Sequence, residues 1–186
     1  MRNAIPDHLS EHMNLLFVGF NPSLRSGESG HHYANPHNRF WKLLHESGLT
    51  ERRYHPDQDS ELLTDYGYGF TNIVARPTRT AAEITKQEYR EGARLLRQKL
   101  SHYRPPLVCY VGKGVYEQLT DRRPIPWGVQ EPSIVPGVTD FVAPSSSGLV
   151  RMPLAEITEI YRELRQLVAA ARHERDDAGE LTSSKE

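Results

Sequence analysis

The chain of 186 residues contains one cysteine, Cys109, which lies inside the apolar run Leu107 to Val111. A single cysteine cannot form an intramolecular disulfide, and it cannot supply the four thiolates that hold an iron–sulfur cluster. Its apolar neighbours predict a small buried side chain in a strand rather than a nucleophile. Redox chemistry of the chain's own thiols is therefore not expected.

Long apolar stretches and an excess of one charge are also missing. No run of about 18 apolar residues is present, which a membrane-spanning helix requires, and residues 1–13 lack the apolar core of a secretory signal. These absences predict a cytoplasmic protein without a membrane partner. The formal net charge is −1, so no overall positive field indicates nucleic-acid binding, and contacts with phosphates are expected to be local.

Several catalytic motifs are absent. The sequence has no Gly-x-Ser-x-Gly, His-Glu-x-x-His or Cys-x-x-Cys, and Gly112-Lys113-Gly114 is too short for a phosphate-binding P-loop. Three histidines, His31, His32 and His37, fall in one loop, but no carboxylate or cysteine accompanies them at a metal-ligand spacing. A hydrogen-bonding role is favoured over a metal site.

Apolar runs alternate with helical patterns along the chain. This alternation predicts a parallel or mixed α/β sandwich in one domain. The composition turns charged and small after Ala171, which predicts disorder from 172 to 186. Strands are expected at 15–20, 69–74, 107–111 and 139–142, and helices at 36–48, 61–64, 85–103, 113–119 and from Pro153.

The stretch around Asn21 is the first candidate site. The strand that begins at Leu15 stops at Gly19 to Ser23, which delivers Asn21 at its carboxyl end, where ligands bind in open α/β sheets. The following loop, Asn21 to Asn35, is rich in Gly, Ser, His and Pro, and long loops of this kind tend to be functional. The alternative is an Asn that caps a turn before Pro22, which is common.

Five motifs follow one another along the chain: Gly19-Phe20-Asn21-Pro22-Ser23, Gly30-His31-His32-Tyr33, Asn38-Arg39-Phe40-Trp41, Gly69-Phe70-Thr71-Asn72 and Pro144-Ser145-Ser146-Ser147-Gly148-Leu149-Val150-Arg151. In this order they resemble the mismatch-specific uracil and thymine DNA glycosylases of the uracil-DNA glycosylase superfamily. The similarity runs from about Leu15 to Leu167 and implies a three-layer α/β/α sandwich with a central, mostly parallel four-stranded sheet in one domain over residues 1–171. It also implies excision of a pyrimidine opposite guanine without a metal or other cofactor.

The resemblance implies a catalytic residue and a base pocket. Asn21 would be the water-positioning residue: its neutral amide is no base near pH 7, but its oxygen can orient a water. Tyr33 would stack on the extruded base, and Asn72 would contact the polar edge of the pyrimidine. Phe20, Ser26 and His32 complete the expected pocket.

The last motif is the expected DNA-binding loop. The hydroxyls of Ser145, Ser146 and Ser147 suit phosphate oxygens, and Leu149 would fill the hole that base flipping leaves. Gly148 would let the backbone approach the duplex, and Arg151 would hold a phosphate or the strand of the orphaned guanine. An ordinary surface loop is the alternative.

Ser23 departs from the family pattern, because it replaces a glycine and adds a Cβ beside the expected sugar site. Two other features favour uracil over thymine: Gly148-Leu149-x-Arg151 is similar to the bacterial uracil-preferring branch, and Ser26 stands where the thymine-acting branch carries a smaller apolar residue, so its hydroxyl would crowd the thymine methyl. We therefore expect a monomeric, monofunctional glycosylase that acts on U·G mismatches in double-stranded DNA, with thymine excised weakly or not at all, and that hands abasic sites to downstream repair enzymes. The alternatives are a catalytically weak sensor of mismatched or abasic DNA and, more remotely, an N-glycosidase of free nucleosides.

Overall fold

The computed structural model describes residues 4–183, and the side chains of residues 4–179. Its sheet has five strands in the order β2-β1-β3-β5-β4. The first four are parallel neighbours, and β4 pairs antiparallel with β5 at the edge. The strands are β1 (Leu15–Gly19), β2 (Tyr68–Asn72), β3 (Leu107–Val111), β4 (Gly128–Gln130) and β5 (Thr139–Ala143).

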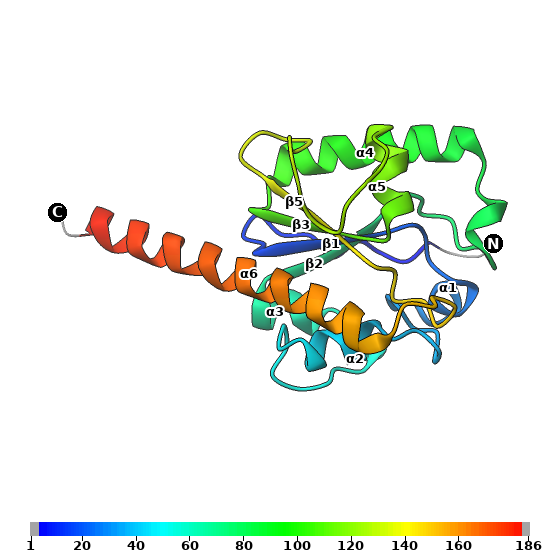
Figure 1. Ribbon diagram of the computed structural model, residues 1–186, viewed down its shortest axis with the longest axis horizontal. Coiled ribbons are helices and arrows are strands. Elements are labelled where there is room, and N and C mark those ends of the chain that lie inside the picture. The colour runs from blue at the N-terminus through cyan, green and yellow to red at the C-terminus, as the bar shows by residue number, and fades with distance from the viewer. Residues whose placement is uncertain (1–3, 184–186) are drawn as a thin grey trace.

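Helices cover both faces of the sheet, which confirms the three-layer α/β/α sandwich. In Figure 1, α4 and α5 lie on one face, and α2, α3 and α6 lie on the other. The helices are α1 (Leu24–Ser29), α2 (Phe40–Glu46), α3 (Glu61–Tyr66), α4 (Lys86–Tyr103), α5 (Lys113–Thr120) and α6 (Leu154–Ser183), with 3-10 turns η1 (Pro56–Gln58) and η2 (Ala81–Glu83).

The alternation of side chains along β1 divides the core in two. Leu15 and Phe17 join the cluster under α2 and α6, whereas Leu16 and Val18 join the cluster under α4 and α5. A strand that is buried on both faces has a continuous run of apolar residues in its sequence. For this reason the central strands could be predicted from the sequence.

The predicted strand count was too low by one. The missing strand, β4, has only three residues, and Val129 at its centre is 42% exposed. A short edge strand without a buried apolar run carries no period-2 signal. It extends the sheet at the end away from β1, so it does not alter the geometry around Asn21.

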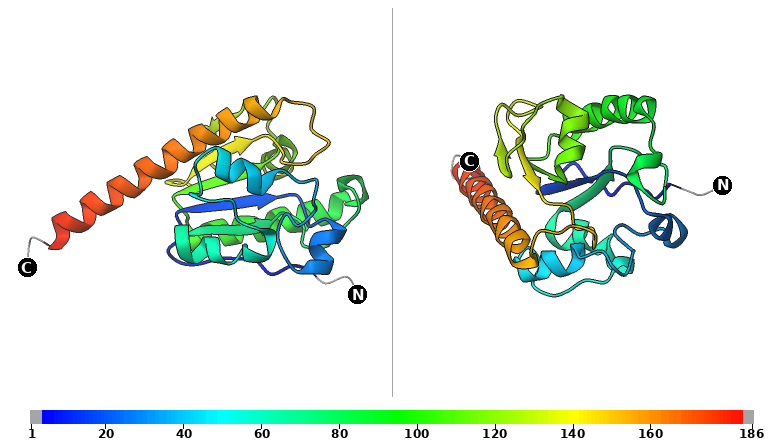
Figure 2. Two further views of the ribbon diagram at one scale, coloured as in Figure 1. Left: turned by 90° about the horizontal axis from the view of Figure 1, so that it is seen from below. Right: turned by 45° about the vertical axis from the view of Figure 1, so that its right-hand side comes forward.

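The segment after Ala171 also differs from the expectation of disorder. Helix α6 continues to Ser183, and Figures 1 and 2 show its second half projecting beyond the sheet, away from α1. Val168 is the last buried residue that the structure describes in this helix, and residues 172–179 are exposed. Strong helix formers such as Ala169 to Arg172 continue the helix beyond its last buried residue, and Arg175 Nη2 there donates to Asn14 Oδ1. Residues 184–186 lie outside the described part. No helix within it is both long and apolar enough to cross a membrane.

Candidate active site

A cavity of about 760 Å³ opens at the carboxyl ends of the parallel strands. It is lined by segments far apart in the chain: the end of β1, α1, the loop before α2, the end of β2 and the loop after β5. Of the residues predicted for the site, Arg151 alone does not line it. The predicted residues that do are Phe20, Asn21, Ser26, His32, Tyr33, Asn72, Ser145, Ser146, Ser147, Gly148 and Leu149.

Helix α1 forms part of the wall that was predicted to be a loop. Ser23 caps it, because its hydroxyl oxygen accepts the Ser26 N–H at 3.1 Å. Ser23 has φ −67° and ψ 164°, an extended conformation that does not require glycine. The departure from the family's glycine is therefore compatible with the backbone. Ser26 is buried, and its hydroxyl oxygen accepts the Ala34 N–H at 3.0 Å, which ties α1 to the next segment.

The Asn21 side chain is held in one orientation. Its Nδ2 donates to the Arg76 carbonyl oxygen at 2.9 Å and to Thr78 Oγ1 at 2.7 Å. The Thr78 hydroxyl in turn donates to the Thr80 carbonyl oxygen at 2.8 Å, so its oxygen can only accept from Asn21. Both neighbours of the amide nitrogen are thus acceptors, and the amide cannot be flipped without losing both bonds. Asn21 Oδ1 has no protein donor among the described residues and is free to accept from a water.

Thr78 was not predicted as a site residue. The sequence suggested only that Arg76-Pro77-Thr78 closes the second strand, and its 57-residue separation from Asn21 hides the contact. The bridge between Ser23 and Thr78 brings the two segments together. No local signal in the sequence reports a pairing of this kind, because it depends on the parallel register of β1 and β2.

Tyr33 and Asn72 meet above Gly19. A Cβ at Gly19 would lie 2.6 Å from Asn72 Oδ1 and 3.1 Å from the Tyr33 hydroxyl, so the glycine leaves room for both side chains. One face of the Tyr33 ring stacks on Phe40, with 3.9 Å between the ring centroids. The Tyr33 hydroxyl is buried without a hydrogen-bond partner among the described residues, and burial raises its pKa, which keeps it protonated. The Asn72 amide has no protein partner there either, so both groups can serve a ligand.

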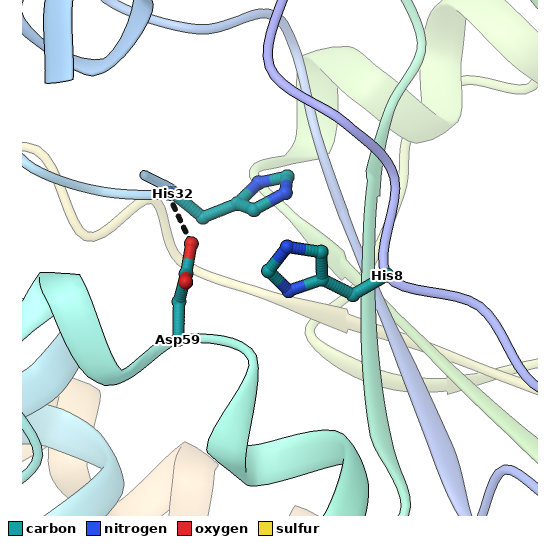
Figure 3. A group of neighbouring side chains, drawn as sticks. All are labelled: His8, His32 and Asp59. Carbon is teal, nitrogen blue, oxygen red and sulfur yellow. Dashed lines mark hydrogen bonds between the residues drawn. The ribbon is translucent and has the colours of Figure 1, made fainter. Parts of the chain in front are cut away.

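His32 supports the cavity from behind rather than facing solvent. Its backbone N–H donates to Asp59 Oδ2 at 2.8 Å, and its Nε2 donates to the Pro6 carbonyl oxygen at 2.9 Å. His31 Nδ1 lies 3.1 Å from the other oxygen of Asp59. Figure 3 shows His8, His32 and Asp59 converging, and their ligand-type atoms lie within 4.8 Å of one another. The contacts of Asp59 and His32 hold the loop in place, whereas Nδ1 of His8 is buried without a hydrogen-bond partner among the described residues.

The burial of His32 predicts a pH-dependent stability. Burial, assisted by the nearby His8, lowers the pKa of His32 from 6.5 to about 4, although the Pro6 hydrogen bond opposes the shift. Between these values the unfolded chain binds the proton and the folded chain does not, so the free energy of unfolding should fall as the pH drops from about 6.5 to 4, by at most about 3 kcal/mol. His32→Gln should lose this part of the dependence in urea unfolding measured across the same range. Parallel curves for the two proteins would contradict the assignment.

Arg39 fixes the loop that follows β5. Its backbone N–H donates to the Ser146 carbonyl oxygen at 2.9 Å, and its Nη2 donates to the carbonyl oxygens of Ser147 and Val150 at 3.2 and 3.4 Å. A Cβ at Gly148 would lie 2.7 Å from the His37 carbonyl oxygen, so this glycine is required by the packing of the loop onto the protein itself. The sequence motif contained Arg39 but gave no sign of this role.

The loop presents its side chains unequally. Ser146 is buried, whereas Ser145 and Ser147 are half-buried; their hydroxyl oxygens accept the N–H groups of Ser147 and Leu149, which leaves their O–H groups free to donate. Leu149 is 92% exposed, the most exposed large apolar side chain of the described residues. Arg151 is exposed outside the cavity.

Comparison with known proteins bears on this site. The family model of the uracil DNA glycosylase superfamily matches residues 6–165 of the chain. Among solved structures, the fold is similar to the solution NMR structure of a candidate uracil DNA glycosylase from Methanosarcina acetivorans, with 24% sequence identity and a TM-score of 0.57 over 88% of this chain and 98% of that chain. At this identity the structural match supports the shared fold. The family match includes every predicted site residue.

Proposed function

Because this chain belongs to the uracil DNA glycosylase superfamily, we propose that it excises uracil from U·G mismatches in duplex DNA and leaves an abasic site. The observation that carries the proposal is the fixed amide of Asn21. Its Nδ2 is held by Arg76 and Thr78, so that Oδ1 remains available in the cavity.

The proposed reaction is hydrolysis of the bond between the base and the sugar. Cleavage passes through an electron-poor, oxocarbenium-like sugar, so a weak nucleophile suffices when a water is held in position. Asn21 Oδ1 accepts a hydrogen bond from that water, whose oxygen bonds to the sugar carbon while the pyrimidine departs with the electron pair of the broken bond. The water's extra proton is lost to solvent, and the pyrimidine anion takes up a proton from solvent, so that the products are the neutral base and the abasic sugar. Asn72 and the Tyr33 hydroxyl offer hydrogen bonds to the polar edge of the pyrimidine.

A monofunctional route is favoured by the composition of the cavity. Among the described residues, no lysine lines it, and a lyase mechanism needs an amine that can form a Schiff base. We therefore expect the enzyme to stop at the abasic site without cutting the strand.

Uracil is the proposed base because Ser26 lines the cavity, where its hydroxyl would crowd the methyl group of a bound thymine. Ser26→Ala should raise the ratio of T·G to U·G excision rates roughly fivefold, the effect of relieving about 1 kcal/mol of crowding. Single-turnover rates on the two duplexes give this ratio. An unchanged or lower ratio would remove Ser26 from the selectivity.

One assay tests the function. Labelled duplexes containing U·G, T·G or U·A are incubated with the protein and EDTA, and abasic sites are then cleaved with alkali. We expect U·G cleavage first, T·G cleavage weak or absent, and no strand break without alkali. Product retention without turnover would instead indicate a sensor of mismatched DNA, and competition by free nucleosides rather than by duplex would indicate a nucleosidase. Loss of activity in EDTA would contradict the metal-free reaction.

A further inference from the structure

A second cavity adjoins the candidate active site. Its volume is about 310 Å³, and it shares Tyr33, Asn35 and Asn38 with the catalytic cavity. Its outer side is formed by α1 and by the segment from Arg53 to Asp57. The two cavities therefore share the segment from Tyr33 to Asn38 as a common wall.

Two arginines border this second cavity without an ion pair. Arg25 on α1 and Arg53 are exposed, and neither has a salt bridge or a hydrogen bond to any described residue. The adjacent Arg52, in contrast, is used within the protein: it pairs with Glu61 at 3.1 Å, and its guanidinium lies 3.8 Å from the centre of the Tyr54 ring. The acidic residue of the lining, Asp57, lies 2.9 Å from His55 Nδ1. With two arginines against this one carboxylate, the lining carries a net positive charge.

The inner walls are apolar. Trp41 and Tyr54 are buried, and their polar atoms are already used: Trp41 Nε1 donates to the Tyr33 carbonyl oxygen at 3.2 Å, and the Tyr54 hydroxyl donates to Asp65 at 2.8 Å. Pro36 and Pro56 complete these walls. Unpaired arginines beside apolar walls suit a phosphodiester together with the base or sugar attached to it.

We propose that this second cavity binds the nucleotide of the damaged strand that neighbours the flipped one. Arg25 and Arg53 contact its phosphodiester, and the walls around Trp41 and Tyr54 receive its base or sugar. The inference rests on the proposed function, because it takes the strand to enter through the catalytic cavity. The proposed site also explains how a chain with a net charge of −1 binds DNA, because the positive charge is concentrated locally at Arg25 and Arg53.

The first test measures the salt dependence of binding. The probe is a duplex with a tetrahydrofuran abasic analogue opposite guanine, which the enzyme cannot turn over, and its affinity is measured by fluorescence anisotropy across KCl concentrations. The logarithm of the association constant K falls as log [KCl] rises, and Arg25→Ala and Arg53→Ala should each make this slope shallower by about 1. The double variant should make it shallower by about 2. Arg53→Lys should keep the slope. Arg172→Ala, which removes one exposed charge from the projecting half of α6, is the matched control and should leave it unchanged.

A second readout locates the nucleotide. 2-Aminopurine is placed on either side of the abasic analogue, and its emission is expected to change on binding at one of the two positions and to revert in the Arg25→Ala, Arg53→Ala double variant. This site would be overturned if the arginine variants kept the salt slope of the Arg172→Ala control, or if the emission changed at neither position. Either result would leave the proposed function standing, provided that the wild type still excises uracil. A wild type that releases no uracil but keeps the arginine-dependent slope would defeat the proposed function and leave the site standing.

Discussion

Asn21→Ala is expected to lower the rate of uracil release from U·G duplex about 100- to 1,000-fold, the range typical for loss of a group that positions a reacting molecule. The truncation removes Oδ1, the one atom of the amide that the protein leaves without a donor. Affinity for duplex with the abasic analogue should change less than about threefold, because the contacts assigned to binding lie on the loop of Leu149 and at Arg25 and Arg53, and not on Asn21. Single-turnover kinetics and anisotropy measure the two quantities separately.

Thr78 supplies a matched control for the orientation of this amide. Thr78→Val removes the acceptor of Asn21 Nδ2 and leaves the backbone contact with Arg76, so the rate should fall by less than in Asn21→Ala, while KM stays near the wild-type value. Thr78→Ser keeps the hydroxyl and should restore the rate. An Asn21→Ala enzyme with wild-type turnover would remove Asn21 from its proposed role, whatever Thr78 does.

The sequence predicted those parts of the fold whose side chains are buried on a regular period. Leu15 to Phe20 and Leu107 to Val111 are apolar throughout because both faces of their strands are covered, and the pattern of α4 repeats at helical spacing. Strand β4 and helix α1 were not predicted, because they lack buried apolar side chains at a regular spacing. In β4 the buried positions hold Gly128 and Gln130 while Val129 is exposed. The buried residue of α1 is Ser26, so neither element shows a buried apolar pattern.

The residues of the candidate site also fall into those that a local sequence pattern predicts and those that it does not. Asn21 and Asn72 could be placed from the sequence because Asn21 follows an apolar strand, Asn72 ends one, and parallel strands end at a common edge. The supports of the site are different in kind. Thr78 reaches Asn21, Asp59 reaches His32 and Arg39 reaches Val150 across 57, 27 and 111 residues, and hydrogen bonds over such separations leave no periodicity in a single sequence.

Leu149→Ala is expected to lower kcat/KM on U·G duplex about 10- to 100-fold, which corresponds to losing most of the 1.5–3 kcal/mol that a leucine gains when it is taken out of water. Leu149 is 92% exposed, so the free enzyme holds an apolar side chain in solvent that a flipped-out base would allow it to bury in the duplex. The loop itself should persist in the variant, because Arg39 holds it through the carbonyl oxygens of Ser147 and Val150 and not through the leucine.

The contrast between duplex and single-stranded substrate decides whether Leu149 acts as a wedge. A single strand offers no stack to fill, so release of uracil from it should change less than about twofold in Leu149→Ala. Leu149→Met should retain most of the duplex activity, since its side chain is similar in volume and apolar. Leu95→Ala is the matched control: it shortens another partly exposed leucine, 41% exposed on α4, and should leave both substrates unaffected. Equal losses on duplex and single strand would show that Leu149 supports the loop or the pocket, and the role of filling the stack would then have to be assigned to a different residue of the 145–151 loop.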